Sequence, residues 1–137
     1  MNNLLDVMDG KKSQKGTTPC IQIASLLFKA VTDAHITHLI QDDKTLARHN
    51  AMSIMYEALP GLIDTLVEIS MGLYPGTTDI EVEASCKISN PLSYVKDLYN
   101  QVDTLRKPIK ETFIQSHIDI IQEELVHAMY RLQYIQS

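Results

Sequence analysis

The sequence is poor in the residues that mark several classes of protein. Its two cysteines are too few for the disulfide framework of a small secreted scaffold, which favours a reducing compartment. Five glycines and five prolines exclude a fibrous or low-complexity chain. No run of about 18 apolar residues predicts a membrane span. Residues 1–10 carry Asp6 and Asp9 instead of a basic start and an apolar run. We therefore expect no signal peptide and a cytoplasmic protein.

The overall composition is that of one soluble globular domain. Of the 137 residues, 45% are hydrophobic and 21% are charged, with a formal net charge of −5. This length gives room for a single core, and the acidic balance excludes a generally basic, DNA-coating surface. Residues 1–19 are polar and aperiodic, so we expect a mobile tail before a folded domain over residues 20–137. The tail holds three lysines, Lys11, Lys12 and Lys15.

From Cys20 onward, apolar residues recur at intervals of three and four, the period of an amphipathic helix. The first helical pattern ends at the polar residues 41–44, which predict a loop. A second pattern contains Pro60–Gly61, and because its apolar residues resume in register after the proline, we predict a continuous, kinked helix. The apolar stripe expected for this second helix is Ala51, Ile54, Met55, Ala58, Leu62, Thr65, Leu66, Ile69 and Leu73.

The least helical part of the folded region spans residues 75–91. Residues 79–84 alternate like a strand, but one short strand has no partner in this sequence. We therefore expect a long connection that crosses the bundle. Pro91 then opens a third helix, with Asn90 or Ser89 as its N-cap.

A fourth helix follows Pro108 and carries the clearest periodicity in the sequence. Residues 112–115, Thr-Phe-Ile-Gln, have the spacing of a capping box. Short links within the first and last helix pairs, and a long link between them, predict an all-α four-helix bundle with a crossover between helices two and three. The apolar seam of the fourth helix is Ile114, Ile118, Ile121, Leu125, Ala128, Leu132 and Ile135.

Four ionisable side chains near the ends of the first two helical patterns form a candidate metal site. His38 lies at the end of the first pattern, and His49 opens the second. Asp64 and Glu68 are four residues apart, so both carboxylates project from one helix face. Two imidazoles and two carboxylates are a suitable ligand set for a redox metal such as iron.

The order of these residues resembles the ferroxidase signature of the Dps-type miniferritins, a ferritin-like family. The sequence reads His38, then His49, then Asp64-Thr-Leu-Val-Glu68, and residues 62–68 match the second-helix segment of that family closely. Residues 123–132 resemble its acidic and aromatic closing segment, with Tyr130 where a Trp is common. The resemblance extends over residues 21–135.

The resemblance implies a ferritin-like bundle that assembles into a hollow homo-oligomer, commonly of twelve subunits. His38 and His49 of one subunit and Asp64 and Glu68 of its neighbour would bind ferrous iron. Peroxide or oxygen would oxidise this iron, and the shell would store the ferric product. The family often binds DNA non-specifically through lysine-rich arms, a role that Lys11, Lys12 and Lys15 would fill here.

Some residues depart from the family pattern and leave other interpretations open. Ser53 occupies the position, four residues after the second histidine, where the family usually has Asp, and Leu39 replaces a Trp. The interval between the two histidines is one residue short, which makes His35 an alternative counterpart of His38. Ser53 supports a second hypothesis, a structural or virus-encoded assembly protein whose metal site is degenerate. A DNA-binding protein without iron chemistry is a third.

A second candidate metal pair lies on the fourth helix. Glu124 and His127 have the Glu-x-x-His spacing of di-iron bundles. Such a site needs a second Glu-x-x-His, which the sequence lacks, so an ordinary pair at the bundle edge is the other interpretation. Cys20 and Cys86 have no metal-ligand spacing, and we interpret them as small apolar residues.

Overall fold

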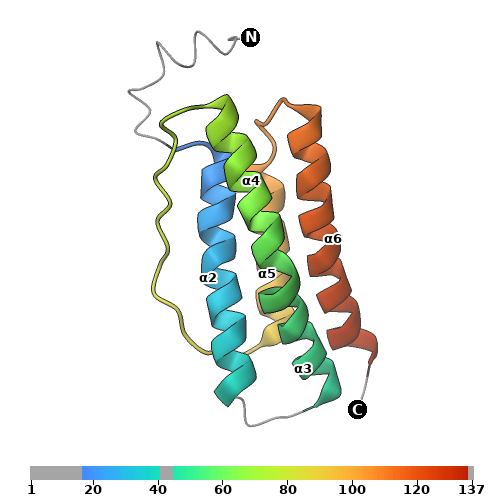
Figure 1. Ribbon diagram of the computed structural model, residues 1–137. Coiled ribbons are helices and arrows are strands. Elements are labelled where there is room, and N and C mark those ends of the chain that lie inside the picture. Colours follow the sequence, from blue (N-terminus) through green and yellow to red (C-terminus); the bar gives the residue numbers. More distant parts are fainter. Residues whose placement is uncertain (1–16, 41–44, 136–137) are drawn as a thin grey trace.

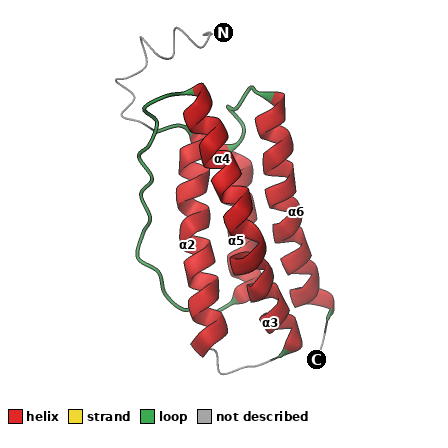
Figure 2. Cartoon of the chain, in the orientation of Figure 1, coloured by secondary structure: helices red, strands yellow, loops and turns green. Residues whose placement is uncertain are grey.

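A computed structural model describes residues 17–40 and 45–135 of the chain. These residues form an all-α fold of four long helices with no strand (Figures 1 and 2). The second of the four is continuous but consists of three consecutive elements. In chain order, the elements are α2 (Pro19–Ile40), α3 (Leu46–Ser53), η2 (Ile54–Ala58), α4 (Leu59–Leu73), α5 (Pro91–Leu105) and α6 (Thr112–Tyr134).

The first helix, α2, begins one residue before the predicted boundary of the folded domain. Pro19 occupies its first position, where a missing N–H costs nothing. The Thr18 hydroxyl accepts a hydrogen bond from the Ile21 N–H at 3.2 Å. The same hydroxyl lies 3.2 Å from the Ser70 hydroxyl of α4, which joins the beginning of α2 to the end of α4.

The second helix passes through Pro60–Gly61 without a break, as predicted. Proline lacks an N–H and its ring displaces the carbonyl four residues earlier, and the π-helical turn η2 lies directly before it. A π turn holds one more residue than an α turn, so it changes which positions face the core. Beyond the turn, α4 buries Leu59, Ile63, Leu66 and Ser70. The predicted stripe is therefore only partly confirmed in this half, because Leu66 is buried but Ala58, Leu62, Thr65, Ile69 and Leu73 are half-buried, with Leu62, Ile69 and Leu73 packed against the core.

Residues 75–90 connect α4 to α5 without regular secondary structure, as predicted. We call this segment the crossover. It runs along the side of α2 for most of the length of the bundle, so that α4 and α5 run in the same direction (Figure 1). Gly76 has a φ of 91°, the left-handed region that glycine adopts without steric cost, and turns the chain away from the end of α4.

The third helix begins as the sequence predicts. Pro91 is its first residue, and the Asn90 side chain is the N-cap, which accepts a hydrogen bond from the Ser93 N–H at 3.1 Å. This bond satisfies one of the N–H groups that the first turn of a helix leaves without a partner. On this helix, Val95, Leu98 and Val102 are buried in the core.

The capping box predicted for the fourth helix does not form. Glu111 is the N-cap of α6, with no capping bond from its side chain. The Gln115 amide instead donates to the Arg106 and Ile109 carbonyls, both at 2.8 Å. Arg106 Nε returns a bond to Gln115 Oε1 at 2.6 Å, and its Nη2 lies 2.7 Å from Asp119. Gln115 thus closes the α5–α6 loop, and its Oε1, which a capping box would use to accept the N-cap N–H, is taken by Arg106.

The four helices enclose one hydrophobic core, to which the predicted seam of α6 contributes its five positions from Ile114 to Ala128. None of the helices in the described part of the chain is long and apolar enough to span a membrane. The largest fully buried side chains are Ile21, Ile23, Leu27, Met52, Met55, Leu59, Ile63, Leu66, Ile114, Ile118, Ile121 and Leu125.

Candidate functional site

Three histidines and a tyrosine gather at the end of the bundle where α2 meets α3. The His38 and His49 rings lie with their centroids 4.5 Å apart and are tilted by 48°. Tyr56, from the π turn, lies 5.1 Å from the His38 ring and stacks on the His35 ring at 4.6 Å. His38 is half-buried, whereas His35 and His49 are exposed. The fold therefore brings the two predicted histidine ligands together.

Local structure explains how the two histidines meet. α2 and α3 run in opposite directions (Figure 1), with His38 near the last residue of α2 and His49 near the first residue of α3, while residues 41–44 lie outside the described part of the chain. Thr45 caps α3 by accepting the Arg48 N–H at 3.3 Å, which fixes the first turn on which His49 lies. His49 is exposed, whereas His38 is half-buried and its Nδ1 atom is buried.

Ser53 takes no part in this cluster as a ligand. Its hydroxyl donates to the His49 carbonyl at 3.0 Å, the bond that serine commonly makes to the preceding turn of its own helix. A carboxylate at this position would reach further and carry charge. The structure thus gives the site two nitrogen donors without the acid that the resemblance leads one to expect there.

Asp64 and Glu68 are exposed on one face of α4, as the spacing predicts. They do not join the histidines within one chain, because fifteen helical positions between His49 and Asp64 correspond to about 22 Å of helix axis. Over residues 17–40 and 45–135, no three His, Cys, Asp or Glu side chains form a group that could hold a metal. Any site that uses all four predicted ligands therefore needs a second chain.

The other candidates from the sequence contribute less. Glu124 is half-buried and His127 is exposed on α6, and they belong to no group of three potential ligands in the described residues. Lys11, Lys12 and Lys15 lie outside the described residues. Burial raises the pKa of the Cys20 thiol to about 11, so this cysteine is a neutral core residue at physiological pH.

Comparison with known proteins gives one family. The model of a family of unknown function, DUF5856, matches residues 40–132, which is more than half of the chain. The chain belongs to the DUF5856 family. No curated protein and no solved structure matches it. The family match includes His49, Asp64 and Glu68, and begins two residues after His38.

A second polar cluster in this DUF5856 protein escaped the sequence interpretation. The Asp33 carboxylate on α2 is fully buried and accepts hydrogen bonds from Lys29 Nζ at 2.6 Å, the Tyr94 hydroxyl at 2.6 Å and the Cys86 N–H at 2.9 Å. One turn later, Thr37 Oγ1 accepts the Ile88 N–H at 2.7 Å. We call Lys29, Asp33, Thr37 and Tyr94 the crossover anchor, because they hold the crossover against α2 and α5.

The charge of Asp33 follows from its partners. Burial tends to raise the pKa of this carboxyl, but the hydrogen bonds from Lys29, Tyr94 and the Cys86 N–H outweigh it and lower the pKa below 3.8. Burial and the bond to Asp33 raise the pKa of Tyr94 far above its usual range. The sequence did carry a signal for this cluster, since Asp33 interrupts the apolar face between Ala30 and Ala34.

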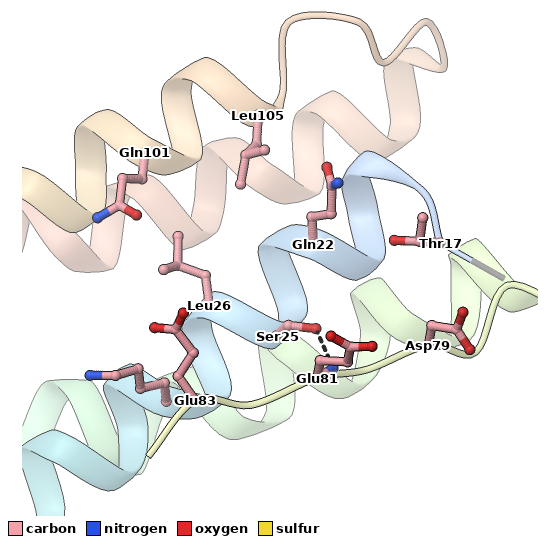
Figure 3. A pocket seen from close by; sticks show the side chains of 10 residues that line it. Thr17, Gln22, Ser25, Leu26, Asp79, Glu81, Glu83, Gln101 and Leu105 are labelled. Atoms are coloured by element: carbon pink, nitrogen blue, oxygen red, sulfur yellow. Dashed lines mark hydrogen bonds between the residues drawn. The ribbon is translucent and has the colours of Figure 1, made fainter. Parts of the chain in front are cut away.

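The DUF5856 crossover also borders an open pocket of about 520 Å³. Figure 3 shows Asp79, Glu81 and Glu83 on the crossover beside α2 and α5. The Glu81 N–H donates to the Ser25 hydroxyl of α2 at 3.1 Å, and this bond holds the middle of the crossover against α2. The pocket lies on the side of α2 covered by the crossover, and it contains none of the predicted metal ligands. Its remaining lining residues are Thr17, Gln22, Leu26, Lys29, Gln101 and Leu105.

Proposed function

We propose that this DUF5856 protein is a ferritin-like bundle of the Dps type, which binds and oxidises ferrous iron at a site shared by two chains and stores the product in a hollow homo-oligomer. The observation that carries the proposal is the approach of His38 and His49, whose ring centroids lie 4.5 Å apart although eleven positions separate them. Iron is the substrate here, and imidazole and carboxylate are ligands that it accepts.

The order and direction of the helices support the same proposal. The bundle has four helices, α4 and α5 run in the same direction, and the crossover joins them over most of the bundle length (Figure 1). One long crossover distinguishes ferritin-like bundles from simple up-and-down bundles. A family match by sequence leaves the function of DUF5856 unassigned, so the proposal depends on this topology and on the placement of the ligands.

The exposed face of α4 suits a contact with a neighbouring chain. Asp64 and Glu68 lie on this face between two glycines, Gly61 and Gly72, which are also exposed. A Cβ added at either glycine would meet no atom within 4 Å. The backbone of α4 is therefore accessible on both sides of the carboxylates, and a partner that carries the histidine pair can come close to them.

The chemistry follows from the two halves of the site. Carboxylates from α4 stabilise the ferric product more than the ferrous substrate, because the higher charge binds anionic oxygen more strongly. Imidazoles hold the ferrous ion without neutralising it. In the reaction with peroxide, two ferrous ions each lose one electron, and hydrogen peroxide accepts both electrons to become two hydroxide ions.

A complementation experiment tests the shared site. We expect the full chain with His38→Ala and His49→Ala, and separately the chain with Asp64→Ala and Glu68→Ala, to lose peroxide-dependent iron oxidation. Mixed assemblies of the two variants regain it, because about a quarter of randomly formed sites receive intact histidines from one chain and intact carboxylates from the other. Stopped-flow absorbance of ferric iron measures the rate.

The matched control replaces two exposed carboxylates of the crossover, Glu81→Ala with Glu83→Ala, and keeps the wild-type rate. Mixed assemblies that stay as inactive as either parent contradict a site between chains. A wild-type rate in the Asp64→Ala, Glu68→Ala chain contradicts iron oxidation at these residues altogether.

A second candidate function rests on Ser53. Its hydroxyl bonds to the His49 carbonyl and supplies no charge, so the DUF5856 bundle would serve as a structural or assembly protein that keeps the fold without iron chemistry. Metal analysis of the purified assembly after exposure to ferrous iron separates the two functions. The iron protein retains stoichiometric iron that is lost in the Asp64→Ala, Glu68→Ala chain, whereas the structural protein retains none.

A further inference from the structure

The outer face of α6 carries exposed apolar and aromatic side chains that lie outside the hydrophobic core. Phe113 is 54% exposed, Ile120 46%, Tyr130 53% and Tyr134 69%. The Tyr130 and Tyr134 rings already contact one another, with centroids 5.6 Å apart. Scattered exposed apolar residues are normal in soluble proteins, but four of them along one face of a single helix mark an interaction surface.

The spacing of this face is that of a helix–helix interface. Among the exposed positions of α6, the series 113, 116, 120, 123, 127, 130 and 134 advances in alternating steps of three and four, which is the heptad pattern. The buried seam on the other side of α6 follows the same pattern from Ile114 onward. The helix therefore carries two seams, one filled by the bundle and one, which we call the outer seam, without a covering element among the described residues.

The charges in the outer seam indicate which partner fits it. Glu123 and His127 lie at its centre and are both exposed. Neither forms a side-chain hydrogen bond or ion pair with any other described residue. A second α6 in antiparallel orientation, with a two-fold axis at the level of Leu125, places Glu123 of each chain opposite His127 of the other. A parallel copy would instead place two Glu123 side chains against one another, which is repulsive.

We propose that two copies of this chain pair in antiparallel orientation along the outer seam of α6. The same two-fold axis places Ile120 of each chain against Tyr130 of the other, and Tyr134 over Ser116. Such a contact is self-complementary, because every pair of residues occurs twice. The central polar pair fixes the register, as single polar residues do in coiled coils, and the apolar pairs on both sides supply the affinity.

This contact is separate from the proposed iron site, since it uses none of the residues His38, His49, Asp64 and Glu68. The proposed pairing also assigns Glu124 and His127 roles other than that of the candidate metal pair. His127 belongs to the outer seam, and Glu124, which is half-buried, lies outside it.

Solution mass tests whether the surface pairs. We expect the full chain to contain at least two copies at micromolar concentration. The variant Ile120→Glu with Tyr130→Glu, which places carboxylates opposite one another, raises the dissociation constant of the pair at least about tenfold. The matched control Val82→Glu, at a position 49% exposed on the crossover, keeps the wild-type mass. Light scattering after size exclusion measures the mass, and circular dichroism checks that the helices are retained.

Disulfide trapping tests the register in chains that keep Ile120 and Tyr130. In a Cys86→Ser background, Glu123→Cys and His127→Cys are made in separate full chains. We expect the oxidised mixture to form a cross-linked pair, and each variant alone to form little. A monomeric wild-type chain, an unchanged mass in the Ile120→Glu, Tyr130→Glu variant, or cross-links of Glu123→Cys to itself that equal those of the mixture would each overturn the proposal.

Discussion

Asp33 shows how a single residue joins parts of the chain that are far apart in sequence. Its carboxylate is fully buried and accepts hydrogen bonds from Lys29, Tyr94 and the Cys86 N–H. The Lys29–Asp33 ion pair is not a source of large net stability, because the buried Asp33 carboxylate loses its water while Lys29 stays partly exposed. Removal of one partner is costly, however, since the remaining groups stay buried without a hydrogen bond. The crossover anchor is therefore sensitive to substitution.

The stability of the protein should depend on the charge of Asp33. Because the folded state lowers its pKa below 3.8, the charged carboxylate stabilises the protein above pH 4, and this contribution is lost as the pH falls through the lowered pKa. We expect Asp33→Asn to cost roughly 3 kcal/mol near neutral pH, with a smaller cost at pH 3. Urea unfolding of both chains at each pH measures the difference. A loss of unfolding free energy in Asp33→Asn that does not become smaller at low pH contradicts the role of the charge. The comparison variant Tyr94→Phe keeps the ion pair with Lys29 and should lower the free energy of unfolding by only about 1 kcal/mol.

At the scale of elements, the second helix shows what Pro60 does. The proline removes one backbone N–H, the π turn η2 accommodates the displaced carbonyl, and the face of α4 that meets the core rotates with respect to a regular helix. Tyr56, on the turn itself, contacts His35 and His38. The distortion therefore has two effects, since it positions an aromatic ring in the histidine cluster and leaves Asp64 and Glu68 on the exposed face.

Gly61 gives a test of the exposed face of α4. The added methyl group of Gly61→Ala meets no atom within 4 Å in the single chain, and alanine loses less backbone entropy than glycine in a helix. We expect the free energy of unfolding of the dissociated chain to rise by roughly 0.5–1 kcal/mol. If a neighbour packs closely on this face, the same methyl group weakens the assembly. Chemical unfolding and solution mass, measured on one sample, separate the two effects, and an assembly as stable as wild type argues against close packing at Gly61.

Element prediction from sequence succeeded where local chemistry decides the outcome. Asn90 and Pro91 begin α5 as predicted, since a capping side chain and a proline at the first position act within one turn. The capping box at residues 112–115 failed because Gln115 Oε1, the atom that would accept the N-cap N–H, instead accepts a bond from Arg106 Nε, a donor that only the folded hairpin brings within reach. The stripe of α4 was only partly confirmed, with Leu66 buried but Leu59 and Ile63 buried in place of Ala58 and Leu62, because periodicity analysis assumes a regular helix through Pro60.

At the scale of the whole molecule, two surfaces of one chain are proposed to meet other copies. The exposed face of α4 with the histidine end forms one contact, and the outer seam of α6 forms the other. Closed shells need more than one kind of contact between identical subunits, because a single two-fold contact stops at a dimer. Two separate surfaces on a chain of 137 residues meet this requirement.

The independence of the two surfaces is itself a prediction. We expect Ile120→Glu with Tyr130→Glu to lower the mass of the assembly and yet keep peroxide-dependent iron oxidation, because the proposed iron ligands lie elsewhere. Asp64→Ala with Glu68→Ala should abolish oxidation and leave the α6 cross-link between positions 123 and 127 in place. Light scattering, stopped-flow absorbance and disulfide trapping on the same preparations measure the three quantities. Loss of both properties in either variant would show that the surfaces are coupled.

The sequence by itself determined the number and extent of the helices, the long connection between the second and third, and the seam of the fourth. These features depend on periodicity, prolines and caps, which act over a few neighbouring residues. It also singled out His38 and His49 as candidate ligands.

Only the tertiary structure decided which groups meet. The ring contact of His38 with His49 and Tyr56, the burial of Asp33 against residues 50 and more positions away, and the rotated face of α4 all depend on how helices pack. Packing places side chains from distant segments within a few ångströms of each other, and no local pattern in the sequence records those distances. The same holds for the outer seam of α6, whose residues are exposed because the opposite face of the helix packs into the core of the bundle.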